Sequence, residues 1–273
     1  MKAVIKYPGS KWAAADWIIN YFPEHHSYLE PFFGSGAVLF NKCRSDIETV
    51  NDLDGSVVNL FRWIRDDPEK LAHEIYYTPY ARKVYEEAFQ AETDNSLEQA
   101  VQFCIRLNMG HGFRTSGEKT GWKNDVQGRE KAYAAQDWCS LPERIIQAAQ
   151  RLKGVQIENR PAVELMKRFN YRNVLIYLDP PYMPGTRHGK QYRCEMYDEE
   201  SHAELLDTAK RHKGYAIISG YDSPLYNDML AGWHRAETVC LSQTGSRKTE
   251  VLWMNFEPER YQMRITDYPG VVS

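Results

Sequence analysis

The chain has 273 residues and a net charge of −3, with 42% hydrophobic and 26% charged residues. That balance is typical of a folded globular protein and excludes a disordered chain, and no apolar run approaches the roughly 18 residues of a membrane-spanning helix. The start, MKAVIKYPGSKW, lacks the apolar segment of a signal peptide, and the five cysteines are dispersed without C-x-x-C spacing. We therefore expect a cytoplasmic protein with reduced thiols, no membrane contact and no metal site.

Strands and helices are expected to alternate at both ends of the chain. The first part is predicted to hold a helix from Ser10 to about Tyr21, a short strand before the Gly-Ser-Gly at 34–36, a helix to about Arg44, a strand at 47–52 and a helix capped by Asp54 that runs through Ile64. The last part is predicted to hold strands at 154–159, 173–178, 215–220, 236–241 and 250–256, with helices at 141–154, 162–169, 198–212 and 224–230.

The middle of the chain interrupts this alternation. Residues 66–110 carry helical spacing in pieces, and residues 108–131 are Gly-rich, polar and basic, which is typical of a long functional loop. We therefore predict a discontinuous α/β domain formed by 1–61 and 151–257, an inserted and mostly helical lobe at 62–150, and a loosely held tail at 258–273.

Two motifs mark the ends of the first two expected strands. Gly34 and Gly36 lie between a strand and a helix, where glycines let a ligand approach the backbone, although a G-x-G turn is common without any ligand. Asp52 follows the next strand and is placed to accept the hydroxyls of a ribose, with a helix-capping role as its alternative. Ligands in α/β sheets bind beyond the carboxyl ends of strands, so we expect both motifs at one site.

A third strand, NVLIYL, ends in D-P-P-Y at 179–182. Pro180 and Pro181 stiffen the turn and remove two backbone donors, which leaves the Asp179 carboxylate and the Pro180 carbonyl as acceptors. Tyr182 adds a flat ring. Two acceptors and a ring suit a planar group that bears an NH₂, whereas a rigid strand-ending turn without a ligand is the alternative.

Basic residues gather in two stretches of this acidic chain. Between Arg106 and Lys131 six Lys or Arg stand against three acids, and Trp122 lies among them. Such stretches can bind phosphates. The candidate DNA contacts are Arg114, Lys119, Trp122, Lys123, Arg129 and Lys131, together with Arg187, Lys190 and Arg193 just after D-P-P-Y.

The order of these motifs resembles the Dam-type (alpha-group) DNA adenine N6-methyltransferases, and the middle stretch resembles phage-borne members most. In that order the sequence carries YPGSK, EPFFGSG, ND, an inserted region, DPPY, YDEESHAELL, ISGY and EVLWMNF. The resemblance implies a Rossmann-like S-adenosylmethionine-dependent methyltransferase sheet with an inserted target-recognition lobe. It also implies methyl transfer from S-adenosylmethionine, with S-adenosylhomocysteine as product, to N6 of a flipped adenine in double-stranded DNA.

The resemblance assigns roles to single residues. It implies that the cofactor meets Tyr7, Lys11, Glu30, Pro31, Phe32, Gly34, Gly36, Asp52 and Asp179, and that Asp179, Pro180, Pro181 and Tyr182 hold the target adenine. Lys11 also stands out as a cation expected in a helix's first turn, where it opposes the helix dipole unless a ligand carboxylate pairs with it. After VQIEN, family members often carry an acidic residue and Phe, whereas this chain has Pro161, so we leave that stretch out of the site.

Several alternatives stay open at this stage. A cytosine-C5 enzyme is disfavoured because no Pro-Cys occurs, but cytosine N4 is also an exocyclic amine, and the Asp of the motif only favours adenine. RNA N6-adenine methylation and a catalytically inactive nucleic-acid-binding relative are further alternatives. We expect a monomer, and a cognate restriction enzyme as partner is left open.

Overall fold

The computed structural model describes residues 1–112, 114–124, 133–182, 192–194, 196, 198–241 and 247–258. The predicted tail from 259 onward and the candidate DNA contacts Arg129, Lys131, Arg187 and Lys190 lie outside the described residues. Within the described ranges, no helix is both long and apolar enough to cross a membrane.

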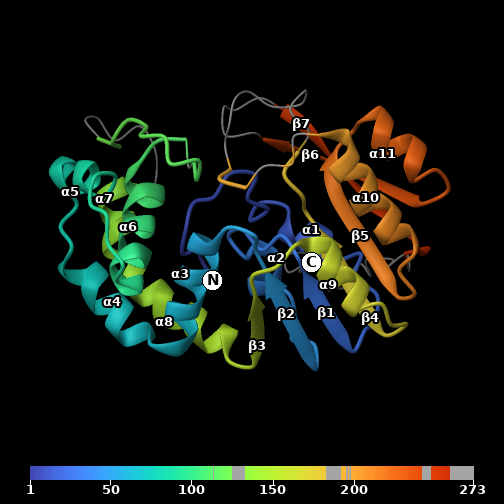
Figure 1. Ribbon diagram of the computed structural model, residues 1–273, viewed down its shortest axis with the longest axis horizontal. Helices are drawn as coiled ribbons and strands as arrows, with labels where there is room; N and C mark the ends of the chain where they lie inside the picture. Colours follow the sequence, from blue (N-terminus) through green and yellow to red (C-terminus); the bar gives the residue numbers. More distant parts are fainter. Residues whose placement is uncertain are drawn as a thin grey trace, which may run out of the picture.

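A seven-stranded sheet forms the centre of the fold (Figure 1). Its strands are β1 (Ser27–Glu30), β2 (Ile47–Asn51), β3 (Val155–Glu158), β4 (Val174–Leu178), β5 (Tyr215–Tyr221), β6 (His234–Leu241) and β7 (Arg247–Met254), in the order β3-β2-β1-β4-β5-β7-β6. The first five strands in that order are parallel, and β7 inserts antiparallel between β5 and β6. This is the predicted Rossmann-like α/β architecture, with a reversal of the strand order beside β1 and β4, where ligands of such sheets bind.

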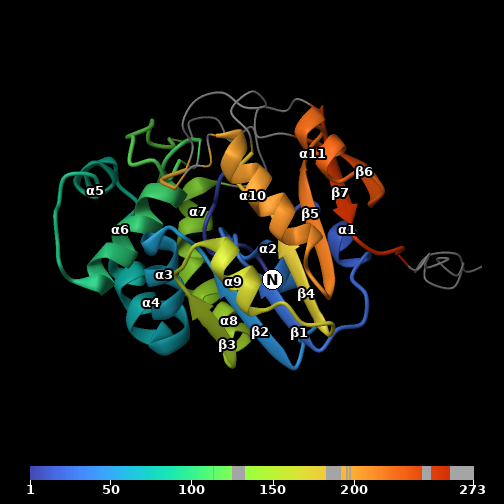
Figure 2. The same cartoon turned by 45° about the vertical axis from the view of Figure 1, so that its right-hand side comes forward.

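Helices cover both faces of the sheet because its buried strands alternate their side chains between two apolar clusters. In β4, Leu175 and Tyr177 join one cluster, while Val174, Ile176 and Leu178 join the other. The first cluster is covered by α1 (Ala15–Ile19), α2 (Ala37–Asn41), α3 (Gly55–Asp66) and α8 (Leu141–Leu152). The second is covered by α9 (Ala162–Arg168), α10 (Glu199–Lys210) and α11 (Pro224–Met229), and Figure 2 shows α9 and α10 in front of the sheet.

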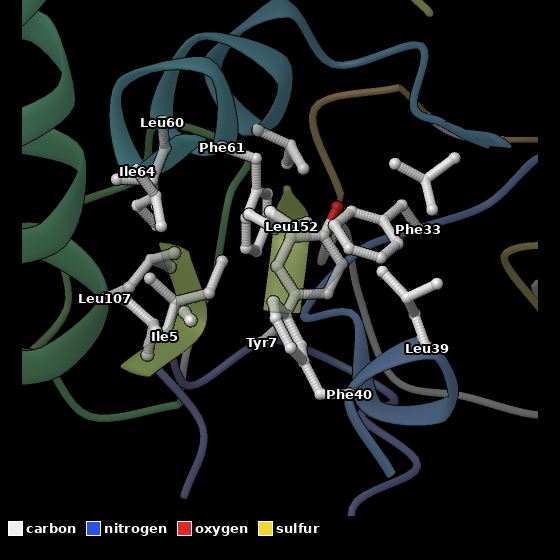
Figure 3. Packing of buried hydrophobic residues seen from close by; sticks show 14 of the residues in the cluster. Ile5, Tyr7, Phe33, Leu39, Phe40, Leu60, Phe61, Ile64, Leu107 and Leu152 are labelled. Atoms are coloured by element: carbon white, nitrogen blue, oxygen red, sulfur yellow. The ribbon is translucent and has the colours of Figure 1, made fainter. Parts of the chain in front are cut away.

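The inserted segment adds further helices at the β3 end of the sheet (Figure 1). They are α4 (Pro68–Tyr77), α5 (Arg82–Glu87), α6 (Ser96–Met109) and α7 (Ala134–Cys139). Figure 3 shows Leu107 of α6 and Leu152 of α8 in the same apolar cluster as Phe61 of α3 and Ile5 of the N-terminal segment. The lobe therefore shares its core with the sheet domain, and the proposed boundary between 61 and 62 falls inside α3.

Two predicted helix bounds are wrong, while the other elements form within a few residues of their expected places. The first helix begins at Ala15 and not at Ser10, because the Ser10 hydroxyl shares a hydrogen bond of 2.8 Å with Ser35 in place of capping a helix. The second ends at Asn41, before Arg44. Asp54 caps α3 as predicted, since its Oδ1 accepts from the Ser56 N–H at 2.9 Å.

Candidate active site

A cavity of about 320 Å³ lies where β1, β2 and β4 end. It is lined by Tyr7 to Lys11, Glu30 to Ser35, Ala37, Val38, Asn51 to Asp54, Pro161 to Val163, Tyr177, Asp179, Pro181, Tyr192, Cys194, Met196, Ser201, Glu204 and Leu205. All the predicted cofactor residues except Gly36 are in this set. Parallel strands thus bring together motifs that stand up to 149 residues apart in the chain, from Glu30 to Asp179.

The Gly-Ser-Gly turn is shaped by its glycines. Gly34 and Gly36 have φ of 50° and 70°, in the left-handed region that glycine adopts without strain. A Cβ at Gly36 would also lie 2.6 Å from ring atoms of Phe33 and Phe40, so no other residue fits there without displacing the core. The turn is fixed from the next strand, because the Gly34 N–H donates to Asp52 Oδ2 at 2.8 Å.

Asp52 is a buried acceptor at the end of β2. Its second oxygen, Oδ1, accepts from the Asp54 N–H at 2.9 Å. Burial nevertheless dominates and raises the pKa of Asp52 to about 7, because neither bond comes from a cation. Each carboxylate oxygen keeps a lone pair, so Asp52 has capacity left for hydroxyl donors.

Glu30 is the buried acid at the end of β1. Its Oε2 accepts from the Tyr28 hydroxyl at 2.8 Å, and burial raises the pKa of Glu30 to about 8, helped by the negative charge of Asp179. An acid in this state favours any ligand that brings a positive charge into the cavity.

Asp179 stands at the end of β4 with its Oδ1 held on two sides. Lys11 Nζ lies 2.9 Å from this oxygen, and the fully buried Ser219 of β5 donates to it at 3.1 Å. Ser219 is in turn hydrogen-bonded to the Tyr177 hydroxyl at 2.9 Å. Burial raises the pKa of Asp179, and the ammonium of Lys11 opposes that rise. The carboxylate is therefore fixed from the N-terminal segment by Lys11 and from β5 by Ser219.

The predicted reason for an unusual Lys11 is wrong in part. The residue precedes α1, so it does not oppose a helix dipole, and its carboxylate partners come from the chain itself. Besides Asp179, Glu250 Oε1 of β7 lies 3.4 Å from Lys11 Nζ, and the Gly9 carbonyl accepts from it at 3.0 Å. Although burial lowers it, the two carboxylates raise the pKa of Lys11 above its ordinary value.

Tyr182 is anchored by its hydroxyl. The hydroxyl donates to Glu250 Oε1 at 2.7 Å and accepts from the Lys11 ammonium. Its ring stands 4.3 Å from the ring of Tyr221, measured between centroids and tilted by 51°. Tyr182, Lys11, Asp179 and Glu250 form one hydrogen-bonded group, which we call the Lys11 cluster.

Comparison with known proteins identifies the family of this chain. Residues 7–240 match the family model of D12 class N6 adenine-specific DNA methyltransferases. The chain belongs to this family. It is an adenine-specific DNA methyltransferase, which decides between the adenine and cytosine alternatives left open by the sequence.

Individual relatives agree with the family match. The chain is 23% identical to a DNA adenine methylase of Vibrio cholerae, over 94% of this chain and 96% of that protein, and 26% identical to the DNA adenine methylase of Escherichia coli K12, over 82% of each. It is 22% identical to a DNA N-6-adenine-methyltransferase of Escherichia phage P1, over 83% of this chain and 31% of that longer protein. Among solved structures, a SAM dependent methyltransferase from Agrobacterium tumefaciens is similar at 10% identity, over 90% of this chain and 61% of that one, with a TM-score of 0.37.

Five of the predicted DNA-contacting residues lie in the described part of the chain, and four of them belong to a small hairpin. Residues 109–112 and 114–123 form this hairpin, since the His111 N–H donates to the Gly121 carbonyl and the Lys123 N–H to the Met109 carbonyl, both at 2.8 Å. Arg114 is paired with Glu118 at 2.7 Å and Lys119 with Glu86 at 3.3 Å, and both cations are partly exposed.

The other two described members of this hairpin set are held more tightly. The Trp122 ring packs against Tyr80, with centroids 5.5 Å apart, and under the Arg82 guanidinium at 4.8 Å. Lys123 Nζ donates to the Asn108 carbonyl at 3.2 Å.

Residues 192–194 lie between this hairpin and the cavity. The Arg193 N–H donates to Thr115 Oγ1 at 3.1 Å, and its guanidinium donates to Ser56 Oγ of α3 at 3.0 Å. The Tyr192 hydroxyl donates to the Pro8 carbonyl at 3.1 Å, and its ring stands 5.9 Å from that of Tyr7. Arg193 therefore joins the inserted lobe to α3, while its neighbours Tyr192 and Cys194 line the cavity.

The stretch after β3, which the sequence analysis leaves out of the site, lies at the cavity. Pro161, Ala162 and Val163 line the cavity as the chain enters α9. The rule that ligands lie beyond strand ends applied here as it did at Asp52, but the missing acidic residue outweighed it. Glu250 was also missed, because no local motif shows that β7 pairs beside β5. Among the described residues, no group of three or more His, Cys, Asp or Glu could hold a metal ion.

Proposed function

We propose that the cavity binds S-adenosylmethionine and that D-P-P-Y presents the target adenine of double-stranded DNA to it. The observation that carries this proposal is that one cavity is lined by Gly34, Asp52 and Asp179, the signature residues of three neighbouring strand ends. When bound, S-adenosylmethionine supplies the methyl group that the reaction transfers.

The residues around the cavity fit such a ligand. Asp52 has the remaining acceptor capacity that ribose hydroxyls need, and Glu30 offers a buried carboxylate to an ammonium group. Pro161, Ala162 and Val163 offer an apolar wall for a base. We assign the ribose to Asp52, the amino-acid end to Glu30 and the Gly34 turn, and the cofactor adenine to the wall at 161–163.

We assign the amino group of the target adenine to Asp179 and the Pro180 carbonyl. Lys11 and Ser219 both approach Asp179 through Oδ1, so Oδ2 is the oxygen that we assign to the amine. A hydrogen bond to an acceptor draws the nitrogen lone pair out of the ring system, which makes N6 a better nucleophile. The effect grows as the amine attacks, so it stabilises the transition state more than the bound substrate.

The target base must leave the duplex to reach these acceptors. Its N6 lies on the pairing edge, and the same amino group cannot serve a thymine and Asp179 together. We therefore propose base flipping, with the ring of Tyr182 as the surface on which the adenine stacks. The hydroxyl anchored on Glu250 and Lys11 keeps that ring from turning.

Cofactor binding is expected to weaken at low pH because of Asp52. Ribose hydroxyls favour the ionised carboxylate, whose pKa is about 7 in this structure, so the Kd should rise up to tenfold through Asp52 for each pH unit below 7. Glu30, with a pKa of about 8, adds a rise that begins below pH 8 and that Asp52→Asn keeps. Asp52→Asn should raise the Kd at pH 8 by about 10–100-fold, the value of a lost charge-assisted hydrogen bond. Calorimetric titration with S-adenosylhomocysteine between pH 5.5 and 8.5 measures both effects.

The matched control is Asp46→Asn, whose side chain is 78% exposed, pairs with His26 and does not line the cavity. It should keep the wild-type Kd and pH profile. If Asp52→Asn binds as tightly as the wild type and with the same pH dependence, the ribose assignment is wrong.

We further propose that the lobe holds DNA through the hairpin 109–123. Lys119 is a partly exposed lysine of this hairpin, and its ion-pair partner among the described residues is Glu86, a carboxylate that a phosphate can replace.

Lys119→Ala is expected to weaken binding of all DNA sequences alike and to lower the slope of log K against log salt by about one. The control Lys167→Ala removes a lysine of similar exposure on α9, outside the lobe, and should leave the slope unchanged. Fluorescence anisotropy over a salt series measures the slope. An unchanged slope in Lys119→Ala contradicts a phosphate contact at this residue.

A further inference from the structure

Glu250 is a buried acid that the proposed function uses only as an anchor of the Tyr182 hydroxyl. It lies on β7, an antiparallel strand inserted after five parallel ones, and only 5% of its side chain is exposed. Its register opposite Tyr221 of β5 brings it to the group that surrounds Asp179. A buried charge is costly unless it is paired, so the contacts of Glu250 indicate its role.

One oxygen of Glu250 makes both of its contacts in the Lys11 cluster. Oε1 accepts from the Tyr182 hydroxyl at 2.7 Å and lies 3.4 Å from Lys11 Nζ. The same ammonium lies 2.9 Å from Asp179. Two carboxylates thus share one lysine, and the cluster holds one negative charge more than it has positive charge.

We propose that Glu250 is a positioning residue for methyl transfer, which acts through Lys11 on the acceptor strength of Asp179 and through the Tyr182 hydroxyl on the orientation of that ring. The proposal rests on the proposed function, because Asp179 and Tyr182 must first be the residues that meet the target adenine.

Lys11 connects the charge of Glu250 to Asp179, because its ammonium contacts both carboxylates. An ammonium bound to one carboxylate alone would pull the pKa of that carboxylate down strongly, and a weakly basic carboxylate is a poor acceptor for an amine. Burial keeps the pKa of Asp179 raised although Lys11 lowers it, and Glu250 shares the same ammonium, so that Lys11 does not bind Asp179 alone. The pKa of Glu250 is itself raised by burial and by the charge of Asp179. The two acids titrate as a coupled pair.

The other titratable or charged groups around Asp179 are unchanged when Glu250 alone is replaced. The titratable or charged groups that face the pair from the described elements are Glu30 of β1, Tyr177 of β4, Tyr192, Tyr226 of α11 and, beyond the Tyr221 ring, Lys248 of β7. The pKa values of the tyrosines Tyr177 and Tyr226 are raised, so these side chains stay neutral over the working range. Glu250 is thus the acid that shares Lys11 directly.

Glu250 affects the Tyr182 ring through its hydrogen bond with the Tyr182 hydroxyl. Tyr182 follows two prolines that stiffen the main chain, and its remaining freedom is rotation of the side chain. The bond to Glu250 removes that freedom at the far end of the ring. Positioning of this kind changes kcat more than it changes ligand affinity.

The test measures the pH dependence of kcat with saturating S-adenosylmethionine and duplex DNA in four proteins: wild type, Glu250→Gln, Glu250→Asp and Tyr182→Phe. Glu250→Gln keeps the shape of the side chain but removes its charge. The acid limb of the pH profile, where kcat falls as the pH decreases, should therefore move down by about one pH unit, the size expected for a like charge a few Å away. Its plateau kcat should fall about tenfold, while the Kd for S-adenosylhomocysteine stays within about threefold. Tyr182→Phe should lower kcat several-fold without moving the acid limb down, because both carboxylates remain and the lost hydroxyl is a group that lowers the pKa of Asp179.

A merely structural Glu250 would lower kcat, or the melting temperature, without moving the acid limb. A Glu250→Gln enzyme with the wild-type limb therefore overturns the proposal. If Glu250→Gln does not fold, Glu250→Asp decides: its charge should keep the limb, but its shorter side chain cannot hold Lys11 and Tyr182 as before, so wild-type kcat in this variant also overturns it.

Glu237→Gln is the matched control for the substitution itself. Glu237 lies on the neighbouring strand β6, is 51% exposed and pairs with Arg235, so its loss should change neither kcat nor the limb. If neither the wild type nor this control methylates DNA, the proposed function is contradicted. That outcome is distinguishable from an unmoved acid limb in an active Glu250→Gln enzyme, which contradicts only the role of Glu250.

Discussion

Replacement of Asp179 by asparagine is expected to lower kcat by about 10²–10³-fold, the scale of removing one aligned group from a transition state. Asparagine keeps the size of the side chain but loses the charge that draws on the amine. The fold should survive, because burial already raises the pKa of Asp179 and a neutral group at this place avoids that cost. Transfer of tritiated methyl groups to duplex DNA measures the loss.

Two readouts separate this expectation from general damage. The Kd for S-adenosylhomocysteine and the melting temperature should stay near the wild-type values. Asp222→Asn, at an exposed acid beside the end of β5 that pairs with Arg235, should keep full activity. Full activity in Asp179→Asn would refute the assignment of the acceptor.

The loss of the Tyr182 ring is expected to lower kcat about 10²-fold and to weaken DNA binding less. Stacking on an aromatic ring returns roughly 1–3 kcal/mol of the cost of flipping, while phosphate contacts carry most of the affinity. Tyr182→Trp should keep part of the activity because it keeps a ring. Tyr182→Phe should keep more, although less than the wild type, since the hydroxyl contact with Glu250 and Lys11 is lost.

A duplex with 2-aminopurine at the target position reports on the same step. In the wild type the flipped base should stack on the ring and stay quenched, whereas Tyr182→Ala should leave it unstacked and bright. A mispaired target should bind more tightly than a paired one, because part of the opening cost is already met. Equal binding of the two duplexes, with no rise of fluorescence in Tyr182→Ala, would exclude flipping onto Tyr182.

Local chemistry made the three strand-end motifs predictable. The glycines before α2, the acid after β2 and the prolines after β4 each reveal a constraint within a few residues, and parallel pairing then carries them to one edge. The same reasoning applies to the strand end before Pro161, where the lack of a charged residue hides a stretch that lines the cavity.

The partners of Lys11 could not be predicted from the sequence. Lys11, Asp179 and Glu250 are separated by 168 and 71 residues, and only the insertion of β7 between β5 and β6 places the last of them beside the others. Nothing in EVLWMNF reveals which way that strand runs. The start of the first helix was also misplaced, because Ser10 can bond a distant serine as well as cap a helix.

The shared core explains why the lobe has no sharp boundary. Leu107 and Leu152 pack with Phe61 and Ile5 in one cluster (Figure 3), so helices before and after the inserted segment belong to both parts. The sequence shows a change from alternating strands and helices to helices alone, but it does not show which apolar side chains of the lobe pack against the sheet domain.

The central claim is that this site transfers a methyl group to N6 of adenine in DNA. The most direct measurement incubates the purified chain with S-adenosylmethionine and unmethylated duplex DNA, digests the DNA to nucleosides and identifies the methylated base by mass spectrometry. N6-methyladenine should form with the wild type and fall by at least about 10²-fold with Asp179→Asn. N4-methylcytosine in its place, or equal N6-methyladenine from the Asp179→Asn enzyme, would contradict the account.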